Sequence, residues 1–316
     1  MTKKPPLILI VGPTGVGKTA VSIYAAKYLN AEIISCDSMQ IYKHMDIGTA
    51  KVTPEEAQGI THHMTDIISP LEKFSVCDYV KMAKEAAKEI YKKSKPAIMV
   101  GGTGLYADSF VKDIDYTETE TDEKLRASLK SYAESHGCEA LHAKLREIDP
   151  ESADAIHPNN VKRVIRAIEY YRLSGEKISE HNEKTKNKPS PYNYIYIGFT
   201  RDRKDLYENI NKRVDIMIEN GLANEVMNLY KMGCRRSHTS MQAIGYKEML
   251  WYINGKATFD EAVEILKKNS RRYAKRQLTW FNKNKDIHWI NLTDVKDIMA
   301  AAEKCLQIIK ENGVLS

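Results

Sequence analysis

Gly12-Pro13-Thr14-Gly15-Val16-Gly17-Lys18-Thr19 decides how the first part of this 316-residue chain folds. The stretch fits the phosphate-binding loop (P-loop) pattern Gly-x-x-x-x-Gly-Lys-Ser/Thr at every fixed position. The apolar run 7–11 precedes it and predicts a buried strand, and residues 20–29 follow it and predict a helix. Between a strand and a helix, the N–H groups of such a loop and the positive end of the helix dipole cradle phosphates.

Each of the last two residues of this loop has an expected role. Lys18 would reach the terminal phosphates, and Thr19 would offer its hydroxyl to Mg²⁺. The pattern therefore predicts binding of a diphosphate or a triphosphate and leaves open which of the two. The following helix is predicted because Val21, Tyr24, Ala25, Tyr28 and Leu29 fall on one of its faces at helical spacing.

Length and composition indicate a globular protein of about two domains. The apolar fraction is 42% and the charged fraction 28%, which are ordinary values for such proteins. No apolar run is long enough to span a membrane. The five cysteines form no Cys-x-x-Cys pair, so neither a zinc site nor a disulfide framework is predicted, and a reducing, cytoplasmic location is expected.

The net charge of +6 is concentrated in two segments. Residues 271–285 hold six Lys/Arg and no acidic residue, interleaved with Tyr273, Trp280 and Phe281, and residues 162–172 hold four Lys/Arg against Glu169. Basic clusters with aromatic residues indicate a polyanion partner such as a nucleic acid. Two solvated helix faces are the alternative interpretation of the same charges.

The first third of the chain alternates strands and helices. Strands are predicted at 32–36 and 96–100, with a helix at 76–93 between them. This alternation predicts an α/β fold, a P-loop NTPase-like parallel sheet flanked by helices. Gly12, Asp37 and Gly101 each follow a strand and should lie along the rim where such sheets bind ligands.

The pattern becomes all-helical after residue 115. Helices are predicted at 123–135, 138–148 and 159–173, followed by a lysine-rich linker at 180–191. A strand at 194–199, helices at 202–220, 222–232 and 258–282, a last strand at 287–290 and a C-terminal helix then resume the core. The expected domains are a catalytic core of residues 1–115 and 191–316 and a helical insertion of residues 116–190.

Asp37 is the strongest candidate for chemistry outside the P-loop. A carboxylate on that rim could hold Mg²⁺ through water or accept a proton from a nucleophile, and Ser38 and Gln40 beside it are hydrogen-bonding residues. A turn aspartate that caps the next segment is the alternative. The strand at 98–100 does not end in the magnesium-binding Asp of a usual nucleotide hydrolase, which disfavours a motor or a GTPase.

The glycine-rich segment 101–104 predicts either a close backbone approach or positive φ angles. On the helix at 159–173, Lys162, Arg163 and Arg166 share one face, opposite an apolar stripe, and could meet phosphates. Arg213 could complete a diphosphate clamp, although a lone helical Arg is often a surface ion-pair partner. The adjacent His62 and His63 favour hydrogen bonding or packing over metal binding, because neighbouring side chains point in different directions.

Several separated motifs together resemble one family, the bacterial tRNA dimethylallyltransferases, also called isopentenyl-tRNA transferases. They cover nearly the whole chain in the expected order and include the P-loop, Asp37-Ser-Met-Gln-Ile-Tyr42, Asp46-Ile-Gly-Thr-Ala-Lys51, His62-His63-Met-Thr-Asp66, Phe74-Ser-Val-Cys-Asp-Tyr79, Val100-Gly-Gly-Thr-Gly-Leu-Tyr106, Arg163-Val-Ile-Arg-Ala-Ile-Glu169, Ala243-Ile-Gly-Tyr-Lys-Glu248 and Arg272-Tyr-Ala-Lys-Arg-Gln-Leu-Thr-Trp-Phe281.

The resemblance implies transfer of the dimethylallyl group of dimethylallyl diphosphate to N6 of the adenosine 3′ of the anticodon in tRNA. In this family the P-loop holds the diphosphate leaving group, with Mg²⁺ expected on it. The residue matching Asp37 accepts the amine proton, the one matching Thr103 contacts tRNA near the reaction centre, and the one matching Arg213 helps to bind diphosphate. The anticodon arm is contacted by the residues matching Asp37, Ser38, Met39, Gln40, Lys162, Arg163 and Arg166.

Physical chemistry agrees with this resemblance. An adenine amine is a weak nucleophile, so a catalyst must orient it, remove its proton and stabilise the departing diphosphate. The base must leave its stack, which is easier in an anticodon loop. We expect a monomer without an obligate protein partner. The rival interpretations are an isopentenyltransferase acting on AMP, a small-molecule kinase, and an RNA-binding protein with a relict P-loop.

Overall fold

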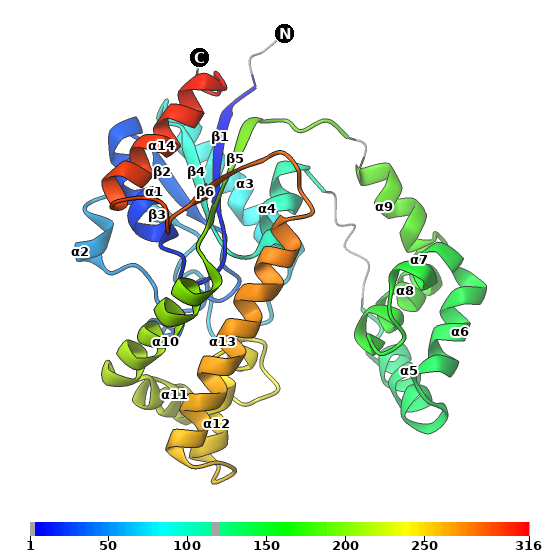
Figure 1. Ribbon diagram of the computed structural model, residues 1–316. Helices are drawn as coiled ribbons and strands as arrows, with labels where there is room; N and C mark the ends of the chain where they lie inside the picture. The colour runs from blue at the N-terminus through cyan, green and yellow to red at the C-terminus, as the bar shows by residue number, and fades with distance from the viewer. Residues whose placement is uncertain (1–3, 115–120, 187, 316) are drawn as a thin grey trace. The chain divides into compact units, whose positions relative to one another are not determined.

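The computed structural model describes residues 4–114, 121–186 and 188–315 and divides the chain into two compact units (Figure 1). Unit 1 comprises Met1–Val111 with Pro191–Ser316, and unit 2 comprises Lys112–Ser190. The boundary expected between residues 115 and 116 lies outside the described residues. Across the described ranges, no helix is both long and apolar enough to cross a membrane.

Unit 1 is built on a six-stranded sheet whose neighbouring strands all run parallel, in the order β3-β2-β4-β1-β5-β6. This confirms the predicted sheet. The strands are β1 (Pro6–Val11), β2 (Glu32–Ser35), β3 (His62–His63), β4 (Ala97–Gly101), β5 (Asn193–Thr200) and β6 (Ile287–Asn291). The helices of this unit are α1 (Lys18–Leu29), α2 (Pro54–Ala57), α3 (Val76–Lys92), α4 (Gly104–Val111), α10 (Arg203–Glu219), α11 (Leu222–Lys231), α12 (Tyr246–Ile253), α13 (Phe259–Phe281) and α14 (Ile298–Glu311), with a 3-10 turn at Ser240–Gln242.

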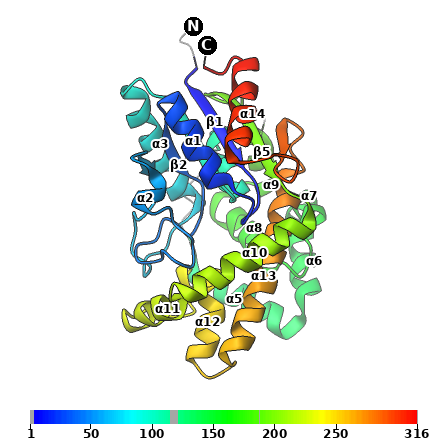
Figure 2. The same cartoon turned by 60° about the vertical axis from the view of Figure 1, so that its left-hand side comes forward.

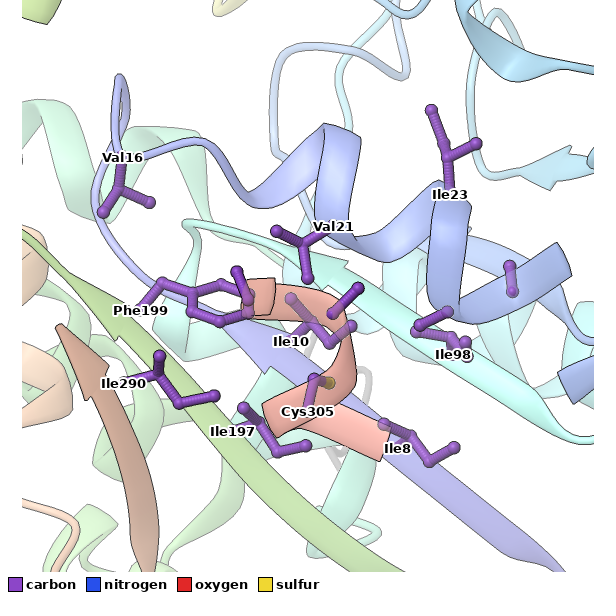
Figure 3. Packing of buried hydrophobic residues seen from close by; sticks show 14 of the residues in the cluster. Ile8, Ile10, Val16, Val21, Ile23, Ile98, Ile197, Phe199, Ile290 and Cys305 are labelled. Atoms are coloured by element: carbon purple, nitrogen blue, oxygen red, sulfur yellow. The ribbon is translucent and has the colours of Figure 1, made fainter. Parts of the chain in front are cut away.

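Helices cover both faces of the sheet, which explains why its strands read as continuous apolar runs. On one face, Ile8 and Ile10 of β1 pack with Val21 of α1 and Cys305 of α14 in a single cluster (Figure 3). Figure 2 shows α1 and α14 side by side over this face. On the other face α4 meets β5, where Asp108 accepts a hydrogen bond from the Tyr196 hydroxyl at 2.9 Å.

Helices α10 to α13 extend past the carboxyl ends of the strands (Figure 1). They enclose a second apolar cluster, in which Tyr42 from the loop after β2 packs with Val214 of α10, Tyr246 of α12 and Leu266 of α13. The loop after β2 is thereby held against the helices. The helices and this loop therefore border the edge of the sheet at which the sequence predicts ligand binding.

Unit 2 contains five helices among its described residues, packed around their own apolar cluster. They are α5 (Glu123–His136), α6 (Cys138–Ile148), α7 (Pro150–Ala155), α8 (Val161–Ser174) and α9 (Ile178–Lys186). Glu169 is fully buried, and its carboxylate accepts hydrogen bonds from Arg126 and Arg166 at 2.9 Å each. The basic face expected on α8 is therefore only partly available, because Arg166 is engaged in this ion pair, whereas Lys162 and Arg163 are exposed.

The local structure differs from the sequence pattern in several places. Tyr28 does not join the buried face of α1 but is 72% exposed, because the helix is covered by the sheet and α14 on its other sides. The segment 180–191 is not a linker throughout, since α9 continues to Lys186. Helix α8, predicted from residue 159, begins at Val161 after the Asn160 cap. The sequence did not predict helices α2, α4, α7, α9 and α12.

The paired histidines are engaged in hydrogen bonds, as expected. His62 Nδ1 lies 2.9 Å from the Ile60 carbonyl, and His63 Nε2 lies 2.8 Å from a carboxylate oxygen of Glu32. Glu32 is 2% exposed and also accepts from Lys93 and Lys95 at 3.0 Å. Burial opposes ionisation of Glu32, but the bonds from His63 and the two lysines outweigh it and lower the pKa of the carboxyl to about 2.

We expect Glu32→Gln to lower the free energy of unfolding by about 2 kcal/mol at pH 7, less than the pKa shift alone implies, because the partners are partly exposed. The folded pKa lies below the unfolded value, so the carboxylate stabilises above the unfolded pKa of 4.5. The difference should shrink as the pH falls from 4.5 towards 2. Urea unfolding across this range measures it, with Glu85→Gln in an exposed ion pair as the control. A pH-independent difference would contradict the assignment.

Candidate active site

A cavity of about 340 Å³ lies at the carboxyl ends of the central strands. Its walls come from the P-loop, the loops after β2 and β4, and helices α10 and α13. This confirms the predicted rim, since Asp37 and Gly101 both line the cavity beside the P-loop. Of the residues predicted to be functional, those that line it are Thr14, Lys18, Thr19, Asp37, Ser38, Met39, Gln40 and Arg213.

The P-loop has the conformation that its glycines predict. Gly12, Gly15 and Gly17 all have positive φ angles, and a Cβ on Gly12 would lie 2.5 Å from the Phe199 carbonyl oxygen. The loop is anchored through Val16, whose side chain is buried and whose carbonyl accepts from Arg201 Nε at 3.0 Å. Helix α1 begins at Lys18, so its N-terminus opens on the cavity.

Of the cations that line the cavity, Lys18 and Arg213 have lowered pKa values. Burial, and next the charge of Arg213, lower the pKa of Lys18 to about 7. Lys18 Nζ donates to the carbonyls of Gly12 and Pro13 at 2.8 and 2.7 Å. Burial also lowers the pKa of Arg213, although a guanidinium stays protonated. Among the described residues, Nε of Arg213 is buried without a hydrogen-bond partner, so this side chain is suited to an anion in the cavity.

Asp37 lies in a loop that hydrogen bonds hold in place. One carboxylate oxygen of Asp37 accepts from the N–H of Met39 at 2.8 Å. The N–H of Ser38 donates to Oγ1 of Thr103 at 3.2 Å, which joins this loop to the one after β4. Asp37 acts favourably on the charges of both Lys18 and Arg213, so the carboxylate and the two cations share one electrostatic environment.

Gln40 is more constrained than a free substrate contact would be. Its side-chain oxygen accepts from the Ser35 hydroxyl at 2.9 Å, and its amide nitrogen donates to the Thr49 and Ala50 carbonyls at 3.2 and 3.3 Å. Gln40 therefore joins the loop after β2 to the segment 49–50. Whether it also contacts tRNA stays a prediction.

Glu225 of α11 fixes the neighbouring segment of the wall. Its carboxylate accepts from the N–H groups of Asp46, Ile47 and Gly48 at 2.8 to 3.1 Å and from the Tyr246 hydroxyl at 2.6 Å. A Cβ on Gly48 would lie 2.5 Å from the Tyr246 ring. Glycine is thus required there for the loop to pack on α12.

The glycines at 101–104 permit close approach, not positive φ angles. Cβ atoms added at Gly101, Gly102 and Gly104 would lie 2.1 Å from the Cys36 carbonyl oxygen, 2.0 Å from Gln277 Nε2 and 2.2 Å from the Trp280 ring, respectively. One of the two expected explanations is therefore confirmed. The groups that approach belong to the protein itself, chiefly to α13.

The sequence predicted a basic surface for a polyanion at residues 271–285 but no catalytic role for α13, which supplies much of the wall of the cavity. Ser270, Tyr273, Arg276 and Gln277 of this helix line the cavity. Burial and the charge of Asp37 raise the pKa of Tyr273 above its ordinary value. The motif at 272–281 could have indicated this role, because residues 273 and 277 are one helical turn apart and lie on the same face of the helix.

A wider cavity of about 1180 Å³ adjoins the first. Lys18, Thr19, Arg213 and Met217 line both cavities, so the P-loop side chains can be reached from two directions. The wider cavity is otherwise bordered by α1, α10 and the segment 46–58.

Lys162 and Arg163, which were predicted to contact tRNA, belong to unit 2 and are exposed there.

The P-loop, the parallel sheet and the two buried cations define a P-loop protein whose cavity is suited to an oligophosphate and has a carboxylate beside the cations. Residues 40–284 match the family described as IPP transferase. A tRNA dimethylallyltransferase of Lachnoclostridium phytofermentans is 48% identical over 310 residues, 98% of this chain and 99% of that protein. The enzyme of the same name from Bacillus subtilis is 50% identical over 93% of both chains.

Solved structures show the same similarity. The full-length tRNA isopentenylpyrophosphate transferase of Bacillus halodurans is 46% identical, with a TM-score of 0.73 over 99% of both chains. A eukaryotic dimethylallyltransferase acting on tRNA is 28% identical, with a TM-score of 0.83 over 98% of this chain and 79% of that one. The chain belongs to the IPP transferase family.

Because the free Lys18 ammonium has a pKa of about 7, an anion that stabilises its charge should bind with uptake of a proton. At pH 8 we expect wild type to take up about 0.5 to 1 proton more than Lys18→Arg on binding inorganic diphosphate, since arginine stays charged throughout. Titration calorimetry in buffers of different ionisation enthalpy measures this difference. Equal uptake by the two proteins would contradict the lowered pKa.

Proposed function

We propose that this protein transfers the dimethylallyl group of dimethylallyl diphosphate to N6 of the adenosine immediately 3′ of the anticodon in tRNA. The observation that carries the proposal is the cavity itself, where Lys18 of the P-loop, Arg213 of α10 and the carboxylate of Asp37 line one space. Membership of the IPP transferase family and relatives named for this reaction support it.

In the proposed reaction, N6 of adenine attacks C1 of the dimethylallyl group while the bond from C1 to the diphosphate oxygen breaks. Lys18, Arg213 and the N–H groups of the P-loop stabilise the charge that develops on the leaving diphosphate. Asp37 accepts the proton that N6 loses. Thr103, whose hydroxyl oxygen accepts from the backbone N–H next to Asp37, would contact the tRNA near the reaction centre.

The residues present fit a magnesium ion that is held mainly by the substrate. Among the described residues, no group of three or more His, Cys, Asp or Glu side chains could hold a metal, and Mg²⁺ commonly binds substrate phosphates and keeps several waters. The Thr19 hydroxyl, at the first turn of α1, would be its protein ligand. The ion would add positive charge on the leaving group.

We propose that the helical insertion binds the anticodon arm of tRNA. Exposed Lys162 and Arg163 on α8 would contact phosphates, which position an RNA without reading its sequence. Arg166, held by Glu169, would contribute to the shape of this surface more than to direct contact. A monomeric state and a cytoplasmic location, where tRNA is modified, complete the proposal and stay predictions.

The proposed function is tested by incubating the protein with radiolabelled dimethylallyl diphosphate, Mg²⁺ and either an unmodified anticodon stem-loop with three successive adenosines or free AMP. We expect label on the stem-loop only. Label on AMP alone would instead identify an adenylate isopentenyltransferase. Label on neither acceptor, with ATP turned over, would identify a kinase.

We expect Asp37→Ala to lower the single-turnover transfer rate by about 10³-fold, because a general base typically contributes 10² to 10⁴. Affinity for the stem-loop should change by less than about threefold, since phosphate contacts dominate RNA binding. Asp260→Ala, an exposed carboxylate in the first turn of α13, is the matched control. Full turnover by Asp37→Ala would exclude the carboxylate from the role of base.

The double variant Lys162→Ala/Arg163→Ala should weaken stem-loop binding and reduce the slope of log K against log salt by about 1.4, or 0.7 per lost contact with a single strand. The transfer rate at saturating stem-loop should stay unchanged. Lys88→Ala/Lys92→Ala on the exposed side of α3 provides the control for net charge. An unchanged salt slope would place the phosphate contacts elsewhere.

A further inference from the structure

Gln277, buried on α13, contacts two of the loops that form the cavity. Its side-chain oxygen accepts from the backbone N–H of Thr14 in the P-loop at 2.9 Å. Its amide nitrogen donates to the Gly102 carbonyl, in the loop after β4, at 2.9 Å. Because one partner is only a donor and the other only an acceptor, a single orientation of the amide satisfies both bonds.

The contacts of Gln277 continue to the proposed base. Gly102 precedes Thr103, whose hydroxyl oxygen accepts from the N–H of Ser38 at 3.2 Å, and Ser38 follows Asp37. A connected series of bonds thus runs from the P-loop, through one side-chain amide, to the loop that carries the carboxylate. In sequence, Gln277 lies 263 residues from Thr14 and 175 from Gly102.

The surroundings leave the amide little freedom. A Cβ on residue 102 would lie 2.0 Å from Gln277 Nε2, so glycine is needed for this approach. Three residues further along α13, Trp280 packs on Gly104 and its ring N–H donates to Asp108 at 2.8 Å. The helix is therefore seated on the 101–104 loop at two successive points.

We propose that Gln277 is a positioning residue that sets the spacing between the diphosphate-binding loop and the loop that carries Asp37. The inference rests on the proposed function and deepens it. The attacking amine, the breaking bond and the leaving diphosphate must be aligned together, and a misplacement of about 1 Å can cost 10²-fold in rate. Gln277 acts through backbone groups of both loops rather than on the substrate.

The first test is Gln277→Met, which keeps the length of the side chain and removes both hydrogen bonds. We expect the single-turnover rate, normalised to active sites, to fall by about 30- to 100-fold. Affinities for inorganic diphosphate and for the stem-loop should each change by less than about threefold, because the groups that bind them remain. Gln307→Met, an exposed residue of α14 bonded to Glu311, is the matched control and should transfer at the wild-type rate.

The second test is Gln277→Glu. If Gln277 had a purely structural role, the rate of this variant relative to wild type would not depend on pH. An ionised glutamate still accepts from Thr14 but repels the Gly102 carbonyl, whereas a protonated one can donate to it. We expect the ratio of the Gln277→Glu rate to the wild-type rate to rise as the pH falls from 8 towards 5. Taking the ratio removes the pH dependence of Asp37 itself.

A normalised single-turnover rate for Gln277→Met within threefold of wild type would overturn the inference. A fall in rate that is fully explained by weaker diphosphate binding would also overturn it. A Gln277→Glu ratio that does not change with pH would also overturn it. Wild-type protein that transfers nothing to the stem-loop would overturn the proposed function and this inference together. Wild-type transfer with an unaffected Gln277→Met would overturn the inference alone.

Discussion

The repulsion between Lys18 and Arg213 is the constraint on which the site depends. Both cations are drawn from water into one cavity, and Arg213 adds to the burial that lowers the pKa of Lys18 to about 7. Asp37 offsets part of this cost for both. Buried charge is unfavourable unless it is paired, so an anion with several oxygens is the ligand that would stabilise this arrangement most. The free protein is in this sense suited to an anion such as diphosphate.

Holding two like charges together requires a rigid frame, and the parallel sheet supplies it. The P-loop is tied to the core by the buried Val16 side chain and by Arg201. Arg213 is carried by α10, which packs on the second apolar cluster through Val214. Helix α10 also packs on the first cluster through Ile210, so both cations are carried by well-packed elements and neither can move away without disturbing packed side chains.

The sequence could predict the parts of this site that short-range patterns encode. The P-loop, the strand ends at Asp37 and Gly101 and the helical insertion all follow from local spacing and periodicity. The rest depends on partners far away in the chain. The sequence places Arg166 on a basic helix face, but the side chain is held in an ion pair by the buried Glu169. Tyr28 is exposed because α14 covers other sides of α1. Gln277 is one polar residue of a long helix until the fold places it between two loops.

The glycine-rich loop after β4 shows how the same scaffold can serve a different reaction. A usual P-loop hydrolase places a magnesium-binding aspartate near such a strand end to assist attack on phosphorus. Here the position holds Gly101 and Gly102, and the space is filled by the Cys36 carbonyl and the Gln277 amide. If carbon rather than phosphorus is attacked, the P-loop only has to stabilise a departing diphosphate, and the acid–base group belongs beside the nucleophile. The carboxylate accordingly lies at the end of β2. The loop after β4 instead connects the P-loop, through Gln277, with the loop that carries Asp37.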